Sequence, residues 1–173
     1  MAKKVLILVE KDFQDMEVMY PYYRLKEAGF DVKVAGSGEK VYEGKYGYPI
    51  ETNGKIENFK SKDFDCVVVP GGWAPDHMKR NKAMVNFIKE MDDKGKIIAA
   101  ICHAASLLVS ANILKGKKMT CFMAVKDDAI NAGADYIDEE VVVNGNLITS
   151  RMPDDLPAFC REIIKALNKQ RNQ

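Results

Sequence analysis

The segment Lys96-Ile97-Ile98-Ala99-Ala100-Ile101-Cys102-His103-Ala104-Ala105-Ser106 joins an apolar run of strand length to small residues that can begin a helix. Such a continuous apolar run is typical of a strand buried on both faces of a parallel sheet. A sharp turn from strand to helix lifts one side chain out of the sheet, and here that side chain is Cys102. The segment therefore predicts an α/β fold that presents a thiol at the end of a buried strand.

Strand and helix patterns alternate along the rest of the chain. Strands are expected at 4–9, 31–35, 65–70, 96–101 and 118–122, and helices at 16–28, 81–93, 104–110, 125–132 and 154–169. Short hairpins are expected at 40–52 and 141–149, the second turning at Asn144-Gly145. Pro21 should kink or delay the first helix, and Asp154 should cap the last one. The alternation predicts one domain over residues 1–173, with a mostly parallel sheet covered on both faces.

Composition limits the possible classes of protein. The chain has 173 residues, 47% of them hydrophobic and 29% charged, with a net charge of +1, so neither nucleic acid nor a membrane is an expected partner. The apolar runs are too short to cross a bilayer and no secretory signal follows Met1, which favours the cytosol. No C-x-x-C pair occurs, so no metal site is expected, and Cys66, Cys121 and Cys160 are interpreted as core residues.

Cys102 is the candidate nucleophile, because a helix N-terminus and free backbone N–H groups at the turn favour the thiolate. An ordinary thiol is only ~3% ionised at pH 7, and lowering its pKa by about 2 units needs ~2.7 kcal/mol. His103 is the candidate base, although in regular structure adjacent side chains point apart, so a sharp turn is needed to bring them together. The alternative is that His103 packs against a neighbouring subunit.

Two further loops should reach the same end of the sheet, since the active crevice of such sheets lies at the carboxyl ends of the strands. Glu17 follows the first strand, and a carboxyl pressed against the thiol should keep a proton and donate a hydrogen bond to the thiolate. Gly71-Gly72 follows a buried strand, and its N–H groups with that of His103 would form an oxyanion hole. Trp73 lies either on a partner surface or in the pocket wall.

These residues belong to stretches that resemble the PfpI-type intracellular protease family, within the superfamily of the Parkinson-disease protein and the class I glutamine amidotransferase-like fold. The matching stretches run nearly end to end: 15–29, 69–76, 100–103, 126–133 and 149–156. The resemblance implies a flavodoxin-like three-layer sandwich with Cys102 as nucleophile, His103 as its partner and Glu17 beside the thiol. It also implies a dimer, or a hexamer built from dimers, in which Asp76 of a neighbouring subunit completes the site.

The chain departs from the family pattern at three places. Ala104-Ala105 follows the Cys-His pair where the family often has Gly-Pro, which changes the shape of the turn. Asp76 is shorter than the Glu of some relatives, which shortens its reach to His103. Gln14 replaces a Glu found in other members and so removes one possible acid.

The sequence leaves two classes of function open. A glutaminase triad is excluded because no histidine follows His103, and the acidic loop 10–14 lacks the glycines of a flavin or phosphate site. The first class is a cofactor-free, stress-protective enzyme whose thiol attacks electrophilic carbonyls: an intracellular peptidase, or a glyoxalase or deglycase acting on methylglyoxal or glycated groups. Small aldehydes suit so small a chain better than peptides. The alternative is a non-catalytic oxidative-stress sensor or chaperone-like protein that uses Cys102.

Overall fold

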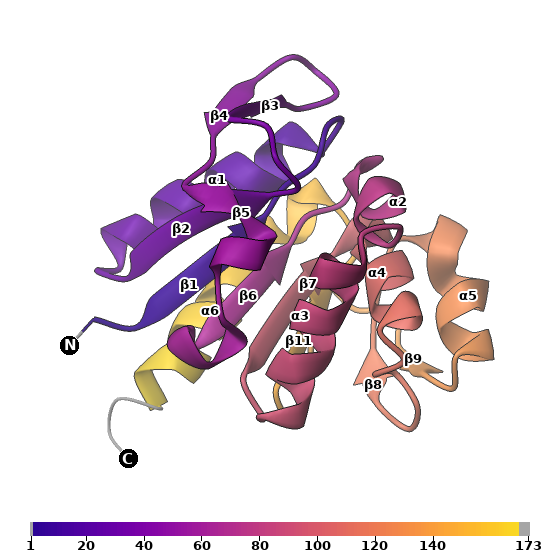
Figure 1. The fold of residues 1–173 in the computed structure, drawn as a ribbon. Coiled ribbons are helices and arrows are strands. Elements are labelled where there is room, and N and C mark those ends of the chain that lie inside the picture. Colours follow the sequence, from indigo (N-terminus) through magenta and orange to yellow (C-terminus); the bar gives the residue numbers. More distant parts are fainter. Residues whose placement is uncertain (1, 170–173) are drawn as a thin grey trace.

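The computed structural model describes residues 2–169 and contains a seven-stranded sheet (Figure 1). In the order β10-β11-β7-β6-β1-β2-β5, its strands are Val142–Asn144, Leu147–Ser150, Ile97–Ile101, Cys66–Val69, Lys4–Leu8, Asp31–Gly36 and Gly54–Lys55. All neighbours are parallel except β10, which pairs antiparallel with β11. The alternating pattern of the sequence therefore predicted the fold class correctly.

Helices cover both faces of this sheet and produce three layers. The helices of the described residues are α1 (Asp15–Glu27), α2 (Ala74–Met78), α3 (Lys82–Asp93), α4 (Ala105–Ser110), α5 (Lys126–Asn131) and α6 (Leu156–Lys169), of which α5 packs on α4 and β9 instead of on the sheet. In Figure 1, α3 lies in front of the sheet, where it packs on β6 and β7. Behind the sheet, α6 packs on β7 and β11 and contacts α1. The flavodoxin-like sandwich is confirmed.

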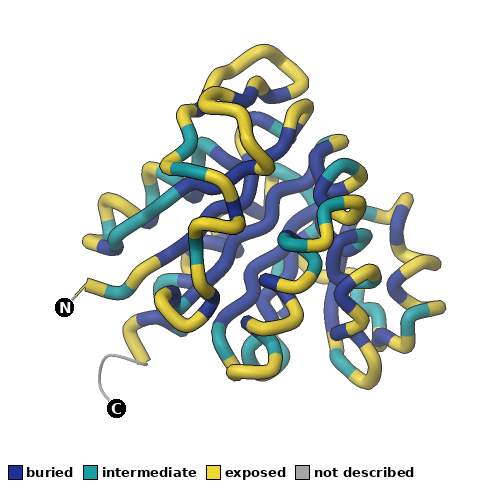
Figure 2. Tube along the Cα trace, in the orientation of Figure 1, coloured by how far each residue is buried: buried dark blue, intermediate teal, exposed yellow. Residues whose placement is uncertain are grey.

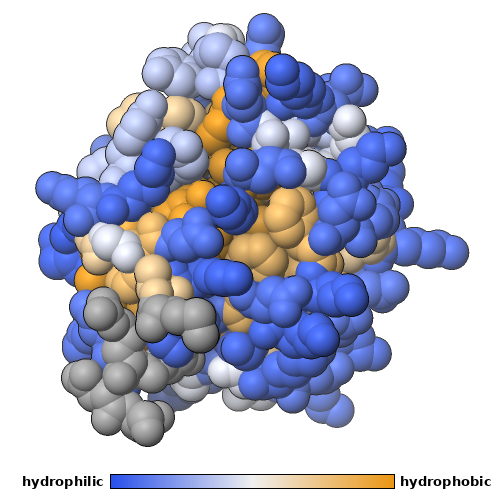
Figure 3. Space-filling model, turned by 60° about the vertical axis from the view of Figure 1, so that its left-hand side comes forward, coloured by the Kyte–Doolittle hydropathy of each residue, from blue (hydrophilic) through white to orange (hydrophobic). Residues whose placement is uncertain are grey.

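The central strands form the core because their side chains are apolar on both faces. Every residue of β6 and β7 is buried, and the buried trace in Figure 2 runs through the middle of the sheet. Cys66, Cys121 and Cys160 are free thiols inside this core, as predicted. On the face drawn in Figure 3, hydrophobic side chains gather in a central patch that hydrophilic ones enclose.

A small hairpin, β3 (Val41–Glu43) and β4 (Pro49–Glu51), stands beside the sheet. The buried Tyr42 fixes it to the end of β2, because its hydroxyl accepts the backbone N–H groups of residues 37–39 at 2.9–3.1 Å. The ring also lies against Gly36, where a Cβ would come within 2.2 Å of it. The hairpin predicted at 40–52 is therefore present and rigidly attached.

Two expectations need correction: the delayed start of the first helix and the capping residue of the last one. The first helix does not start late: α1 begins at Asp15, continues through Pro21, and is capped by the Gln14 side chain, which accepts the N–H of Met16 at 2.7 Å. Asp154 does not cap the last helix, because it lies inside a 3₁₀ turn, Pro153–Asp155, that precedes α6. Its neighbour Asp155 instead accepts hydrogen bonds from Arg151.

Two predictions in the second half also need correction. The strand expected at 118–122 shrinks to β8 (Lys118–Met119), which pairs only with β9 (Asp135–Tyr136) among the described strands and lies outside the main sheet. The last hairpin turns one residue later than predicted, since Asn144 still pairs with Leu147. Gly145, at φ 61°, therefore takes the first turn position, as a type II′ turn requires. Within residues 2–169, no helix is long and apolar enough to cross a membrane.

Candidate active site

The loops that follow β1 and β6 lie against one another at the carboxyl edge of the sheet. Gln14 donates its N–H to the Gly71 carbonyl at 3.2 Å, and Phe13 forms an isolated β-bridge with Gly72. Gly72 has φ 71°, and a Cβ there would lie 2.4 Å from the backbone N of Gln14, so the close approach requires glycine. The topology therefore brings both loops to the end of β7, which Cys102 directly follows.

Cys102 has the backbone of a sharp turn. Its φ is 63°, in the left-handed region that costs a residue with a side chain about 1–2 kcal/mol. The chain passes from β7 into a 3₁₀ turn over Cys102–Ala104 and then into α4. The side chain is 7% exposed and borders a cavity of about 150 Å³. The strand-to-helix turn predicted from the sequence is thus built, and Cys102 lines this cavity.

Glu17 and Cys102 converge on Gly71. Glu17 is fully buried on α1, and its Oε2 accepts the Gly71 N–H at 2.6 Å. A Cβ on Gly71 would lie 2.6 Å from Glu17 Oε2 and 3.0 Å from Cys102 Sγ, so both side chains contact the same point. The other oxygen, Oε1, has no hydrogen-bond partner among the residues that the structure describes. An orphaned carboxylate oxygen is costly to bury, which favours a protonated carboxyl.

Burial controls the charges of this pair. It raises the pKa of Glu17 to about 7, although the Gly71 N–H, Cys102 and Lys45 all lower it. Burial and then the negative charge of Glu17 raise the pKa of the Cys102 thiol to about 12, against the backbone N–H groups of His103 and Gly72. The prediction of a lowered thiol pKa is therefore wrong, first because the thiol is buried and then because Glu17 lies beside it. Two anions in contact are unfavourable, so a thiolate requires that Glu17 keep its proton.

His103 reaches the thiol despite being its neighbour in sequence. Its Nδ1 lies 3.3 Å from Cys102 Sγ, since the left-handed turn brings the two side chains to one side. The imidazole stacks on the Phe122 ring at 5.0 Å between centroids, and the Trp73 ring lies 6.1 Å away. Burial, and then the positive charge of Lys45, hold the pKa of His103 below its usual value. The imidazole is therefore neutral near pH 7 and able to accept a proton.

The two glycines have different tasks. The Gly71 N–H is committed to Glu17, so it holds the carboxyl in place. The His103 and Gly72 N–H groups instead lower the pKa of the Cys102 thiol, because they favour a negative charge on its sulfur. These two donors remain for an oxyanion that forms beside the sulfur.

Asp76 lies apart from His103 within the chain. It is exposed on α2 and forms ion pairs with Lys79 at 3.1 Å and Arg80 at 3.4 Å. Its hydrogen bond and charge interaction with Lys79 hold the pKa of Asp76 below its usual value. Asp76, His103 and the 63%-exposed Trp73 line one surface groove of about 330 Å³. The carboxylate thus faces solvent on the same side of the molecule as the imidazole.

Sequence reasoning missed several residues of the cavity wall. In addition to Trp73, Cys102, His103 and Gly72, the cavity is lined by Gln14, Lys45, Phe122, Met152 and Pro153. Lys45 lies in the β3–β4 loop, and no sequence signal tied that loop to Cys102. The strand expected at 118–122 includes Phe122, whereas β8 ends at Met119. The expected strand therefore gave no sign that Phe122 stacks on His103. Met152 precedes the 3₁₀ turn where a helix cap was expected.

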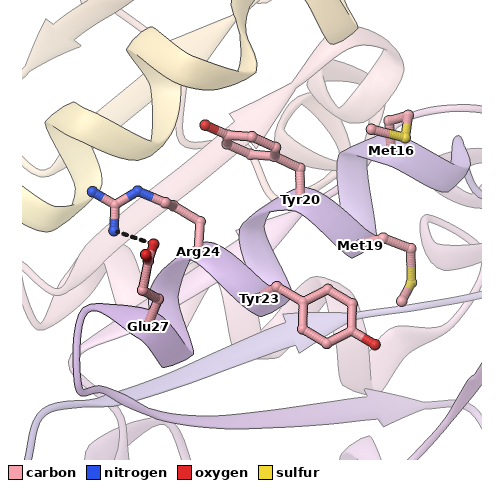
Figure 4. A pocket seen from close by; sticks show the side chains of 6 residues that line it. All are labelled: Met16, Met19, Tyr20, Tyr23, Arg24 and Glu27. Carbon is pink, nitrogen blue, oxygen red and sulfur yellow. Dashed lines mark ion pairs between the residues drawn. The ribbon is translucent and has the colours of Figure 1, made fainter.

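A larger hollow lies elsewhere, on α1. It measures about 590 Å³ and is lined by Met16, Met19, Tyr20, Tyr23, Arg24 and Glu27. Figure 4 shows the apolar side chains spread along the helix, with Arg24 paired to Glu27 at 3.3 Å. None of these side chains is a nucleophile with a base beside it. The pair of a thiol and an imidazole lies in the smaller cavity at Cys102.

Three comparisons place these features among known proteins. The model of the DJ-1/PfpI family matches residues 3–166. The deglycase PfpI of Pyrococcus furiosus is 43% identical over 164 residues, which cover 95% of this chain and 99% of the relative. YraA of Bacillus subtilis, whose name provisionally ascribes cysteine protease activity to it, is 38% identical over 169 residues, covering 96% and 99%.

A solved structure agrees with the fold. It is a two-domain protein with DJ-1/ThiJ/PfpI-like and ferritin-like domains from Anabaena variabilis, with a TM-score of 0.94 and 45% identity. The match covers 96% of this chain and 48% of that one.

Proposed function

Because this chain belongs to the DJ-1/PfpI family, we propose that it is a cofactor-free cysteine enzyme acting on small electrophilic carbonyl compounds. Its substrates would be 2-oxoaldehydes such as methylglyoxal, or the adducts that they form on amines and thiols. The observation that carries the proposal is the meeting of Cys102 Sγ with His103 Nδ1 at 3.3 Å, beside a carboxyl with a pKa raised to about 7. The cytosolic location expected from the sequence belongs to the same proposal.

The first step is addition of sulfur to the aldehyde carbon. The neutral His103 accepts the thiol proton while the Cys102 sulfur forms a bond with C1 of the 2-oxoaldehyde. The C1 oxygen becomes negative and receives hydrogen bonds from the Gly72 and His103 N–H groups. Protonated Glu17 adds no repelling charge at this moment. The imidazolium then returns its proton to that oxygen, and the product is a hemithioacetal.

The remaining steps need only proton transfer and water. His103 removes the C1 proton while the C2 oxygen gains a proton, which gives an enediol; a proton is then delivered to C2 and the C1 hydroxyl loses its proton, so that C1 is oxidised while the neighbouring ketone is reduced. The resulting thioester of a 2-hydroxy acid is hydrolysed, which releases the acid and restores the thiol. Electrons move only within the substrate, so no external oxidant or reductant is consumed.

The size of the cavity favours this chemistry over peptide hydrolysis. A volume of about 150 Å³ accommodates a three-carbon dicarbonyl, whereas a peptide needs subsites on both sides of the bond. Peptidase activity is therefore the less favoured enzymatic alternative. A 2-oxoaldehyde carried on a protein side chain enters the cavity with its small reactive end only.

We also propose that the active form is a dimer, or a hexamer of dimers, in which Asp76 of a second copy orients His103. The support is that Asp76 is exposed and lies on the groove that reaches His103. A strict monomer in light scattering would exclude this arrangement.

An oxidation sensor is the second candidate function. Cys102 is the thiol that borders a cavity, whereas Cys66, Cys121 and Cys160 are at most 1% exposed. Oxidant would therefore reach Cys102 first.

One comparison separates the candidates. Wild type and Cys102→Ala are assayed with methylglyoxal and with a fluorogenic peptide, without added cofactor, and the 2-hydroxy acid is quantified. Acid formation that disappears in Cys102→Ala supports the proposed enzyme. No turnover of either substrate, together with selective peroxide oxidation at Cys102, would replace it by the sensor.

A further inference from the structure

Lys45 is a cation at the mouth of the Cys102 cavity. It lies in the loop between β3 and β4 and belongs to the residues that line the cavity. Among the described lining residues, it alone carries a full charge at neutral pH, since the pKa of His103 is lowered. The other lining residues contribute mainly aromatic rings, a thioether and backbone atoms to the cavity wall.

The backbone of Lys45 is held firmly beside the site. Its N–H donates to the Phe13 carbonyl at 2.9 Å, in the same segment that bridges to Gly72. The Asp15 carboxylate accepts the N–H groups of Tyr46 and Tyr48, each at 3.0 Å. The loop that carries Lys45 is thus attached to the start of α1.

The approach of this loop to α1 is close. A Cβ on Gly44 would lie 2.4 Å from Asp15 Oδ1, so glycine is required directly before Lys45. The position of Lys45 therefore follows from packing and hydrogen bonds rather than from a free loop.

Lys45 lines the cavity, and no carboxylate of the described residues forms an ion pair with it. Within residues 2–169, Lys45 takes part in no ion pair, and its Nζ lies over the 77%-exposed Tyr46 ring at 5.2 Å from the centroid. Its positive charge acts on both Glu17 and His103, whose pKa values it lowers. A cation that faces a cavity without a protein partner is suited to bind an anionic group of a ligand.

We propose that Lys45 is a specificity-determining residue whose ammonium binds an anionic group of the carbonyl compound held at Cys102. The site then prefers anionic over neutral carbonyl compounds of the same size, and it binds the carboxylate of the acid product by the same contact. The inference rests on the proposed function, since it requires that Cys102 add to carbonyls.

Two small aldehydes separate charge from size. Glyoxylate carries a carboxylate next to its aldehyde, and glyoxylamide carries a neutral amide of the same shape. With either, the Cys102 sulfur bonds to the aldehyde carbon, and the thiol proton passes to the oxygen, so a hemithioacetal forms and nothing leaves. Neither probe has a ketone beside the aldehyde, so neither can complete the internal redox reaction. Both are reversible blockers of the thiol.

The experiment measures protection of Cys102 in the full chain. Wild type, Lys45→Met, Lys45→Arg and Lys40→Met are treated with iodoacetamide over a range of each probe, and alkylation at Cys102 is quantified by peptide mass spectrometry. Lys40 lies on the same hairpin and is exposed but does not line the cavity, so Lys40→Met is the matched control. Circular dichroism melts establish that the variants fold.

In wild type and in Lys40→Met, glyoxylate should protect at about five-fold lower concentration than glyoxylamide, an effect in the range of an exposed, charge-assisted contact. Lys45→Met should bring the ratio near one, Lys45→Arg should keep most of it, and 0.5 M NaCl should reduce it in wild type. An equal preference for glyoxylate in wild type and Lys45→Met would overturn the inference.

Protection by neither probe would also overturn it, even if methylglyoxal turnover upheld the proposed function. Conversely, a Lys45-dependent preference without any turnover would uphold the anion site and remove the proposed reaction. The anion site at Lys45 and the proposed reaction at Cys102 are therefore tested by different measurements.

Discussion

The two edges of the central sheet each hold a buried cysteine, and they differ in what surrounds the sulfur. Cys66 begins β6 at the amino edge, is fully buried, and has its Sγ 3.7 Å from the Val67 carbonyl. Burial, and then the charge of Asp65, raise the pKa of that thiol. Cys102 follows β7 at the carboxyl edge and is nearly as buried, yet it contacts a histidine and two N–H donors.

The comparison teaches that burial does not distinguish a reactive thiol from an inert one. At the amino edge, none of the cavities described for residues 2–169 has Cys66 among its lining residues. At the carboxyl edge, loops from β1 and β6 cross the end of β7 and direct N–H groups to one point. The groups that can stabilise a developing charge come from this edge of the fold.

Removing each thiol should give the largest contrast. Cys102→Ala is expected to lower kcat/KM for methylglyoxal by at least about 10³-fold, since the nucleophile is lost. Cys66→Ala should leave kcat/KM within about two-fold and cost about 1 kcal/mol of stability through the small cavity it creates. Steady-state kinetics and urea unfolding measure the two effects. Comparable activity losses in both variants would end the distinction between the edges.

Adding one methyl group at each edge should sharpen the contrast between the two edges of the sheet. Gly71→Ala places a Cβ 2.7 Å from Cys102 Cβ and 2.6 Å from Glu17 Oε2, so the pair must move apart, and kcat/KM should fall by about 10²-fold. Gly95→Ala, before β7, meets nothing within 4 Å but has φ 61°. It should cost about 1 kcal/mol of stability and leave kcat/KM unchanged. A fully active Gly71→Ala would mean that the close packing of Glu17 and Cys102 is dispensable.

Glu17 lies at the carboxyl edge, and because of it the free energy of unfolding should fall as the pH rises. Its folded pKa of about 7 exceeds the unfolded value of 4.5, so the folded state binds more protons between these pH values. The stability of the wild type should therefore drop on going from pH 4 to pH 8 by about 3 kcal/mol from this group. Glu17→Gln cannot ionise and should lack that drop, which urea unfolding at both pH values would measure. Parallel pH profiles for the two proteins would show that the folded pKa of Glu17 stays close to its unfolded value.

The smallest effect is expected where β2 leaves the sheet. Tyr42→Phe removes the hydroxyl that receives three backbone N–H groups, at residues 37–39, and should destabilise the protein by about 1–3 kcal/mol. Because the hairpin also positions Lys45, the probe preference described above should weaken while methylglyoxal turnover persists. Thermal unfolding measures the loss, and an unchanged melting temperature would mean that water satisfies the three donors.

The sequence predicted the layers and the convergence of loops because both follow from apolar runs and from topology. The segments 4–9, 65–70 and 96–101 are apolar enough to specify buried parallel strands, and parallel strands place their following loops at one edge. Cys102, His103 and Glu17 could be brought together by that argument alone. Two departures from the predictions have local causes. The pairing of Asn144 with Leu147 makes the last hairpin turn begin at Gly145, and the 3₁₀ turn displaces Asp154 from its expected capping position.

What could not be predicted depends on packing in three dimensions. The raised pKa of Cys102 follows first from burial of the thiol and then from the charge of Glu17 beside it, neither of which periodicity reveals. Lys45 lies at the cavity because its own N–H donates to Phe13 and because Asp15 accepts two N–H groups of its loop. Both effects arise between residues that no short sequence pattern connects.

The contact of Glu17 with Gly71 and Cys102 joins segments from the beginning, middle and later part of the chain. It can exist only after β1, β6 and β7 have aligned as neighbours, so the catalytic pair is absent from any intermediate with an incomplete centre. Recovery of methylglyoxal turnover during refolding would therefore time the assembly of the three strands, independently of when helical signal returns. The return of that turnover would thus report when the last cooperative stage of folding is complete.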